Sequence, residues 1–192
     1  MERKLKPKTV ENIKFNKSEA DKIYKKYSYN KELTKKLDEF KNDFDLETIY
    51  EIILWKLNRF PMIEESLINS INKLRNYKKN RDKDNAKKIL NELLKIKGIG
   101  LPIASTILRF VNPNQFQIID TRAYRFLTGK YLNEKNTVGK IDELYFDYLE
   151  ALHKLAKQQK IKFNIMDRIL YQADIEYNYK IGLNGKVKKV SE

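Results

Sequence analysis

The sequence contains no cysteine and a single histidine, His153, in 192 residues. Without cysteine, the chain has no disulfides, zinc–thiolate sites or cysteine-ligated iron–sulfur clusters. One histidine makes a histidine-based metal site and Ser-His-Asp chemistry poor expectations. We therefore expect no iron–sulfur cluster and no organic cofactor.

Long apolar runs are also lacking, and none approaches the length of a membrane span. The N-terminal stretch MERKLKPKTVENIKF is charged from its second residue and has no apolar core, so it does not have the pattern of a signal peptide. We expect an intracellular protein without a membrane partner.

The sequence is rich in charged residues, and basic residues outnumber acidic ones. Charged residues make up 34% of the chain, the net charge is +14 and the pI is about 9.6. Such a surface attracts polyanions, with nucleic acid as the first expectation, together with nucleoid association. An AT-rich genome would also produce this excess of lysine without selection for binding, so charge alone leaves both explanations open.

Apolar residues recur at helical spacing, and no stretch alternates as a strand does. This pattern predicts an all-α fold, in a single domain over residues 17–180 that we expect to be monomeric. We expect a basic N-terminal arm over 1–16 and a flexible basic tail over 181–192. The predicted helices are 18–28, 31–43, a buried central helix over 45–58 capped by Asp45, one starting at Pro61, 84–96, 101–111, one following Gly139, and 164–179.

A glycine pair interrupts the helices at Lys97-Gly98-Ile99-Gly100-Leu101-Pro102. Glycine allows backbone angles that other residues avoid, and proline fits the first turn of a helix. The pattern predicts a tight hairpin between two helices, spanning residues 93–111, with backbone N–H groups suited to a phosphate. A plain helical hairpin with a glycine C-cap is the structural alternative.

Asp120 follows the apolar residues FQII and precedes TRAYRFL. An aspartate in this position is a good N-cap for a helix starting at Thr121. That role alone would account for the residue.

Residues 93–127 as a whole resemble the helix-hairpin-helix DNA glycosylases of the GPD superfamily. The hairpin is Lys97 to Leu101, the Gly/Pro-rich loop is VNPNQF, and the aspartate is Asp120, with Ile119-Asp120-Thr121-Arg122-Ala123-Tyr124-Arg125 in place of the usual V-D-T-H-V-x-R. The resemblance extends over roughly residues 45–175, and it implies two helical lobes around a cleft with a helix-hairpin-helix motif.

The resemblance implies an enzyme that flips a damaged or mismatched base out of duplex DNA and breaks its bond to the sugar. Asp120 would be the catalytic carboxylate, stabilising the oxocarbenium-like state or orienting water. Members that also cut the strand carry a Schiff-base lysine two residues after the second glycine, a position that Pro102 occupies here. The resemblance therefore implies a monofunctional glycosylase that leaves an abasic site.

Several further residues are predicted for the site. The DNA contacts would come from the hairpin and the following helix: Lys97, Gly98, Ile99, Gly100, Arg122 and Arg125. The base pocket would use Trp55, Lys56, Asn58 and Arg59, and Tyr171 and Asp174 of the last helix could face the cleft. Core packing of Trp55 and solvation of the charged residues are the alternatives. The resemblance also suggests a monovalent cation, K⁺ or Na⁺, bound by the hairpin backbone near Lys97 and Gly100.

Two other functions stay open. A non-catalytic DNA-binding module on the same scaffold would explain the hairpin and the charge, and Pro102 fits that alternative. A helical protein–protein adaptor, whose charge reflects genome composition, is the third.

Overall fold

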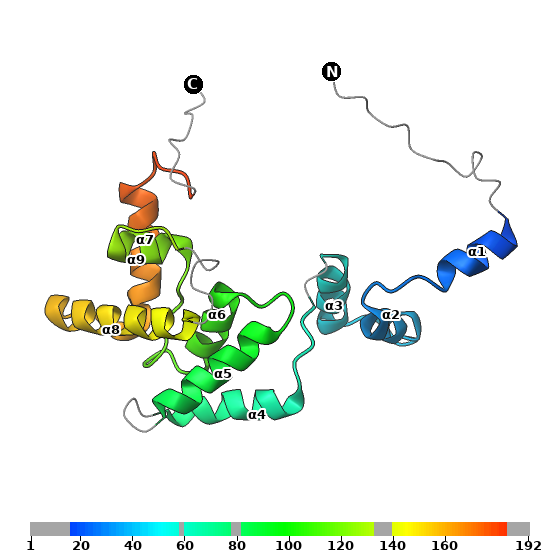
Figure 1. Cartoon of the computed structure of the whole chain (residues 1–192), viewed down its shortest axis with the longest axis horizontal. Coiled ribbons are helices and arrows are strands. Elements are labelled where there is room, and N and C mark those ends of the chain that lie inside the picture. Colours follow the sequence, from blue (N-terminus) through cyan, green and yellow to red (C-terminus); the bar gives the residue numbers. More distant parts are fainter. Residues whose placement is uncertain (1–15, 58–59, 78–81, 133–139, 184–192) are drawn as a thin grey trace, which may run out of the picture. The chain divides into compact units, whose positions relative to one another are not determined.

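The computed structural model describes residues 16–57, 60–77, 82–132 and 140–183, and all regular structure in these ranges is helical (Figure 1). The α-helices are α1 (Lys17–Tyr24), α2 (Lys31–Asp38), α3 (Leu46–Lys56), α4 (Glu65–Lys73), α5 (Lys83–Lys95), α6 (Leu101–Val111), α7 (Thr121–Thr128), α8 (Ile141–Gln159) and α9 (Met166–Tyr177). Two 3-10 turns, η1 (Leu74–Asn76) and η3 (Phe163–Ile165), precede α5 and α9. The all-α prediction is confirmed, and within the described ranges there is no strand.

The chain divides into two compact units, residues 1–60 and 61–192. Unit 1 holds α1 to α3, and unit 2 holds the remaining helices. The boundary falls directly before Pro61. The cleft between two lobes stays a prediction, and most of the predicted arm and tail lie outside the described residues.

In unit 1, Trp55 of α3 contacts the ring of Tyr29 and makes hydrogen bonds to Tyr29 and to Thr34 of α2. Trp55 Nε1 donates to Thr34 Oγ1 at 2.8 Å, and the Tyr29 hydroxyl donates to the Trp55 carbonyl at 2.6 Å. At the other end of α3, Asp45 Oδ1 accepts the Thr48 N–H at 2.7 Å, so the predicted cap is confirmed. These bonds fix the position of α3 against α2.

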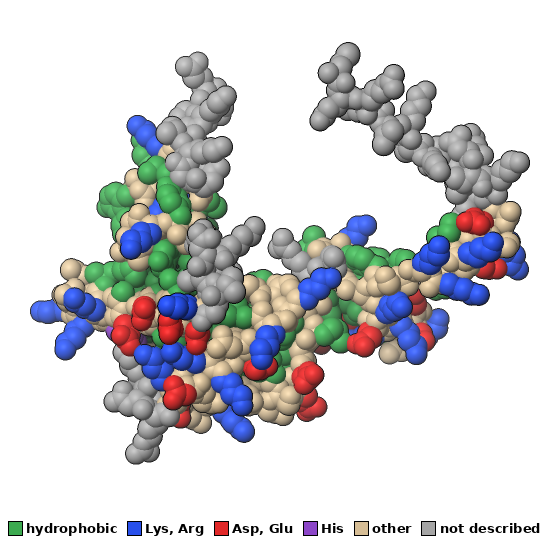
Figure 2. Space-filling view, viewed as in Figure 1, with side chains coloured by type: hydrophobic (Ala, Val, Ile, Leu, Met, Phe, Trp, Pro, Cys, Tyr) green, Lys and Arg blue, Asp and Glu red, His purple; other side chains and the backbone are tan. Residues whose placement is uncertain are grey.

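Within unit 1, α3 is not buried as predicted. Its apolar side chains Ile49, Ile53 and Leu57 are 39%, 48% and 57% exposed, and the buried residue of the helix is Thr48. Hydrophobic side chains are visible on the surface over α2 and α3 in Figure 2. Within unit 1, α3 packs against α2. A single neighbouring helix can cover only one side of α3, so the apolar side chains on its other sides are exposed.

Unit 2 contains the hydrophobic core. Its centre is made of leucines from α5, α6 and α8 with no solvent exposure: Leu90, Leu93, Leu101, Leu108 and Leu152. α7 packs against α9 (Figure 1). The bounds predicted for the helix at 101–111 are confirmed, and α5 differs from its prediction by one residue at each end.

The helix predicted to start at Pro61 begins four residues later, at Glu65. Glu64 has an extended backbone (φ −68°, ψ 144°) and is the N-cap of α4, so the stretch from Pro61 approaches the helix without joining it. Ile63 packs against the core from this extended stretch. α2 also ends earlier than predicted, at Asp38.

Candidate active site and nucleic-acid interface

The glycine hairpin turns at Gly98. The Ile99 N–H donates to the Ile96 carbonyl at 3.0 Å and closes a turn in which Gly98 has φ +93°. L-residues with a side chain rarely adopt this φ, which explains glycine there. Lys97 and Gly98 are exposed at the tip, whereas the Ile99 side chain is buried in the core. Ile99 therefore anchors the turn from inside and presents little of itself to a ligand.

The helix that follows begins at the second glycine. Gly100 is its N-cap, with an extended backbone, and Pro102 lies in its first turn, as predicted. The first turn of a helix has N–H groups without intrahelical acceptors and carries the positive end of the helix dipole. The tip and this helix end together form the candidate phosphate contact. The monovalent cation there stays a prediction.

Asp120 caps α7, as predicted. Its backbone is extended (φ −131°, ψ 174°), and its Oδ1 accepts the Ala123 N–H at 2.7 Å. The residue is half-buried, at the end of the connection from α6. The carboxyl lies at the N-terminal, positive end of the α7 dipole.

Buried side chains hold the irregular segment that leads to Asp120. The carbonyl of Gln117 accepts the hydroxyl of Tyr145 at 3.0 Å, and the carbonyl of Ile118 accepts the hydroxyl of Tyr148 at 2.9 Å. The Ile118 N–H donates to an Asp167 carboxylate oxygen at 3.3 Å. Since backbone groups buried without partners are costly, these bonds make one conformation of the segment strongly preferred.

The side chain of Gln117 holds the same segment through further hydrogen bonds. Gln117 is fully buried; its amide nitrogen donates to the Pro113 carbonyl at 2.8 Å and its amide oxygen accepts the Asp167 N–H at 3.0 Å. Asp167 pairs with Arg109 of α6, with Nε and Oδ2 3.4 Å apart. Helices α6, α8 and α9 thus all contribute to the position of Asp120.

Tyr148 lies close enough to Asp120 to be affected by its charge. Burial raises the pKa of the Tyr148 hydroxyl, and the carboxylates of Asp120 and Asp167 raise it further. The hydroxyl therefore stays protonated near neutral pH and donates to the Ile118 carbonyl.

The two arginines predicted to contact phosphates are paired inside the protein. Arg125 is 5% exposed, and its guanidinium donates to both carboxylate oxygens of Asp174, at 2.8 and 2.6 Å, and to the Gly182 carbonyl at 2.8 Å. Arg122 donates to Asp174 at 3.2 Å and lies over the Tyr171 ring, 5.6 Å from its centroid. The structure thus gives Arg125 an internal role in joining α7 to α9, and it leaves Arg122 more accessible.

Asp174 is fully buried at the centre of this cluster instead of facing a cleft. Burial raises its pKa, but hydrogen bonds from Arg125 and Asn178 outweigh that effect and hold it below the usual value. The pKa of Arg125 is raised by the same pairing. Asp174 is therefore a carboxylate that stabilises the α7–α9 contact in its ionised form.

The predicted base pocket is in unit 1, whereas Asp120 is in unit 2. Trp55 packs edge-on against Tyr29, with ring centroids 5.2 Å apart, as the alternative core interpretation expects. Lys56 is exposed on α3, and Asn58 and Arg59 lie outside the described residues. The pocket role of these residues stays a prediction.

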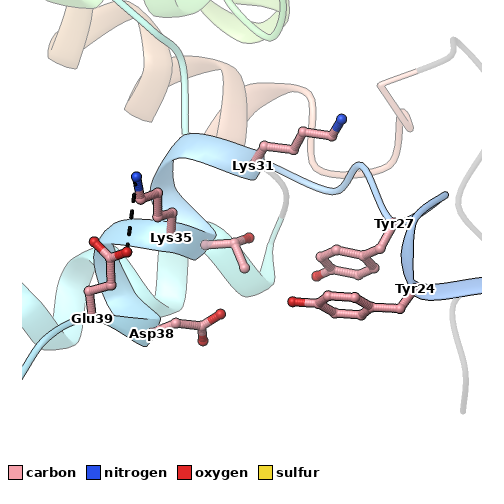
Figure 3. Close-up of a pocket in the computed structure, with 7 residues that line it drawn as sticks. Tyr24, Tyr27, Lys31, Lys35, Asp38 and Glu39 are labelled. Atoms are coloured by element: carbon pink, nitrogen blue, oxygen red, sulfur yellow. Dashed lines mark ion pairs between the residues drawn. The ribbon is translucent and has the colours of Figure 1, made fainter. Parts of the chain in front are cut away.

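Unit 1 has a groove of its own beside α2. The rings of Tyr24 and Tyr27 lie parallel in it, and the rest of its lining is Lys31, Thr34, Lys35, Asp38 and Glu39 (Figure 3). Because the groove has side chains of both signs, it has no net preference for a polyanion. Residues 16–57 as a whole contain nine lysines and nine acidic residues.

Both units carry a basic excess. Residues 1–60 contain 15 lysines and arginines and 11 acidic residues, and residues 61–192 contain 25 and 15. The hairpin and Asp120 are in unit 2, so the candidate site lies in the unit with the larger net charge.

Several residues that build the site were missed from the sequence. They are polar residues within apolar stretches, namely Ser105, Arg109, Gln117, Tyr145, Tyr148 and Asp167. A polar residue at a core position of a helix was the available signal. Helical spacing could not show which backbone group each of these polar side chains would form a hydrogen bond with.

Comparison with protein-family models, with curated proteins and with solved structures gives no significant match for this chain. In the residues that the structure covers, no helix is both long and apolar enough to cross a membrane, and no group of three or more histidine and acidic side chains could hold a metal ion.

Proposed function

We propose that this chain is a monofunctional DNA glycosylase that uses Asp120 as its catalytic carboxylate. One observation carries the proposal: a half-buried carboxylate ends a segment that three helices hold in place, in the same unit as an exposed glycine hairpin. A catalytic group needs such precise positioning, whereas a residue that only caps a helix does not.

The proposed reaction starts at the hairpin. The tip at Lys97 and Gly98 binds a phosphate of duplex DNA, and a damaged or mismatched nucleotide leaves the stack. The ionised carboxylate of Asp120 then stabilises the positive charge that develops on the sugar, or it orients water for attack. The base leaves, and an abasic site remains.

Pro102 determines how the proposed reaction ends. It lies in the first turn of α6, at the position where strand-cutting members of the family that this sequence resembles carry a lysine. Proline has no amine, so it cannot form a Schiff base with the sugar. Water is therefore the proposed nucleophile.

The test uses the full chain and its Asp120→Asn variant on labelled duplexes, each with one modified or mismatched base. Asparagine is as good an N-cap as aspartate, so this change removes the charge and keeps the cap. We expect excision by the wild type, none by the variant, and strand breaks only after hot alkali.

Two results would contradict the proposal. Equal excision by both proteins would mean that Asp120 is not the catalytic group. Strand breaks without alkali would mean that another amine performs a lyase step.

A non-catalytic DNA-binding module is the second candidate. Pro102 favours it, and so does the cap bond at 2.7 Å, which gives Asp120 a structural role without chemistry. This candidate predicts duplex binding without excision of any base, and identical binding by Asp120→Asn.

A further inference from the structure

Ser105 makes hydrogen bonds in two directions from inside the core. Its side chain has no solvent exposure. The hydroxyl donates to the Pro102 carbonyl in the first turn of α6, with the oxygens 2.9 Å apart. The same Oγ accepts the backbone N–H of Ile119 at 3.2 Å. One side-chain atom therefore joins the start of the hairpin helix to the residue just before Asp120.

Helix α6 does not need a hydroxyl at this position for its own stability. Serine is a weaker helix former than alanine, and the adjacent buried positions of α6 are Ala104 and Leu108. The Ile119 N–H, in contrast, lies in a buried connection with no ladder partner of its own and needs an acceptor. The bond to Ile119 is therefore the reason for a polar side chain at 105.

We propose that Ser105 is a positioning residue that sets the place of Asp120 relative to the hairpin. The proposal rests on the glycosylase function proposed above. The hairpin holds the DNA backbone, and the carboxylate must reach the sugar of a nucleotide on that DNA. An error of about 1 Å between the two costs up to roughly 100-fold in rate.

Thr106 provides a matched control. Its hydroxyl donates to the same Pro102 carbonyl, at 2.7 Å, from the neighbouring position of α6. Thr106 is only partly buried. Thr106→Ala therefore removes a hydroxyl from the same helix turn while the bond between Ser105 and Ile119 remains.

The experiment measures three quantities on the full chain: single-turnover excision rate, dissociation constant for the same duplex, and amide hydrogen exchange of the segment 117–120. For Ser105→Ala we expect a rate loss of roughly 10- to 100-fold, a dissociation constant within about twofold of wild type, and faster exchange at Ile119. Thr106→Ala should leave all three at the wild-type level. Tyr148→Phe, which removes the tie at Ile118, should reproduce the effects of Ser105→Ala.

The positioning role is overturned if Ser105→Ala weakens duplex binding as much as it slows excision, or if Thr106→Ala slows excision equally. Unchanged exchange at Ile119 in Ser105→Ala overturns it without reference to activity. If the wild type excises no base, the proposed function fails. The exchange result then still decides whether Ser105 holds the segment.

Discussion

At the scale of single residues, Asp120 combines a cap and a charge in one carboxyl group. One oxygen accepts the Ala123 N–H, and the half-buried position leaves the group within reach of solvent. The two roles respond differently to substitution, because asparagine preserves the cap and alanine removes it.

We expect Asp120→Ala to lower the free energy of unfolding by about 1 kcal/mol and Asp120→Asn to leave it within about 0.5 kcal/mol of wild type. Urea denaturation of the three proteins measures this difference. A loss in Asp120→Asn as large as in Asp120→Ala would show that the charge, not the cap, stabilises α7.

A second residue, Asp174, pairs with two arginines inside unit 2. Asp174→Ala leaves Arg125 buried without its counter-charge, which costs about 3–5 kcal/mol. Thermal unfolding of the full chain should show a large decrease in Tm, whereas Asp147→Ala, at an exposed position of α8, should have little effect. A small decrease for Asp174→Ala would contradict the buried pairing.

The lowered pKa of Asp174 also predicts a pH dependence. Because the folded state holds the ionised form more strongly than the unfolded state does, this carboxylate stabilises the protein above the unfolded pKa of about 3.9. The stabilisation is lost as the pH falls from about 4 through the lower, folded pKa. We expect urea midpoints to fall less steeply below pH 4 in Asp174→Asn than in the wild type, and equal steepness would contradict this.

At the scale of elements, the hairpin depends on one glycine more than the other. Gly98 has φ +93°, whereas Gly100 has φ −90°, which any residue can adopt. A Cβ at Gly98 would meet no atom within 4 Å, so the cost of a substitution there comes from the backbone.

Gly98→Ala should therefore lower stability by roughly 1–2 kcal/mol and weaken duplex binding by disturbing the turn. Gly100→Ala has no such backbone cost. Binding titrations and urea denaturation of both variants test this, and equal stability of the two would contradict the turn geometry.

The helices show which parts of the fold the sequence could predict. The hairpin helix 101–111 and the cap at Asp120 followed from local signals, because proline, glycine and aspartate act on their immediate neighbours. The exposure of α3 and the internal pairing of Arg125 did not follow, since both depend on which distant residues a side chain meets. The hydrogen bonds that Tyr145 and Tyr148 donate to the carbonyls of Gln117 and Ile118 were missed for the same reason.

At the scale of the whole molecule, both units carry a basic excess, and residues 61–192 carry the larger share of it. Because the exposed tip of the hairpin is also in unit 2, we expect unit 2 to make most DNA contacts.

We expect duplex affinity of the full chain to fall with salt, by roughly 10³-fold between 50 and 200 mM if about six phosphates are contacted. Lys97→Ala should reduce the slope of log affinity against log salt by about one, and Lys41→Ala, at an exposed lysine of unit 1, should leave it unchanged. Affinity independent of salt would contradict DNA binding through this surface.

The hydrogen bonds of residues 117–119 also predict an order of folding. Their backbone groups bond to side chains of α6, α8 and α9, so the segment gains its partners only after those three helices have come together. A kinetic study should find Tyr148→Phe speeding unfolding with little change in the folding rate, a φ-value near zero, while substitutions in the core of α5 and α6 slow folding. Asp120 would then reach its place among the last residues, after the helices that carry it have already folded.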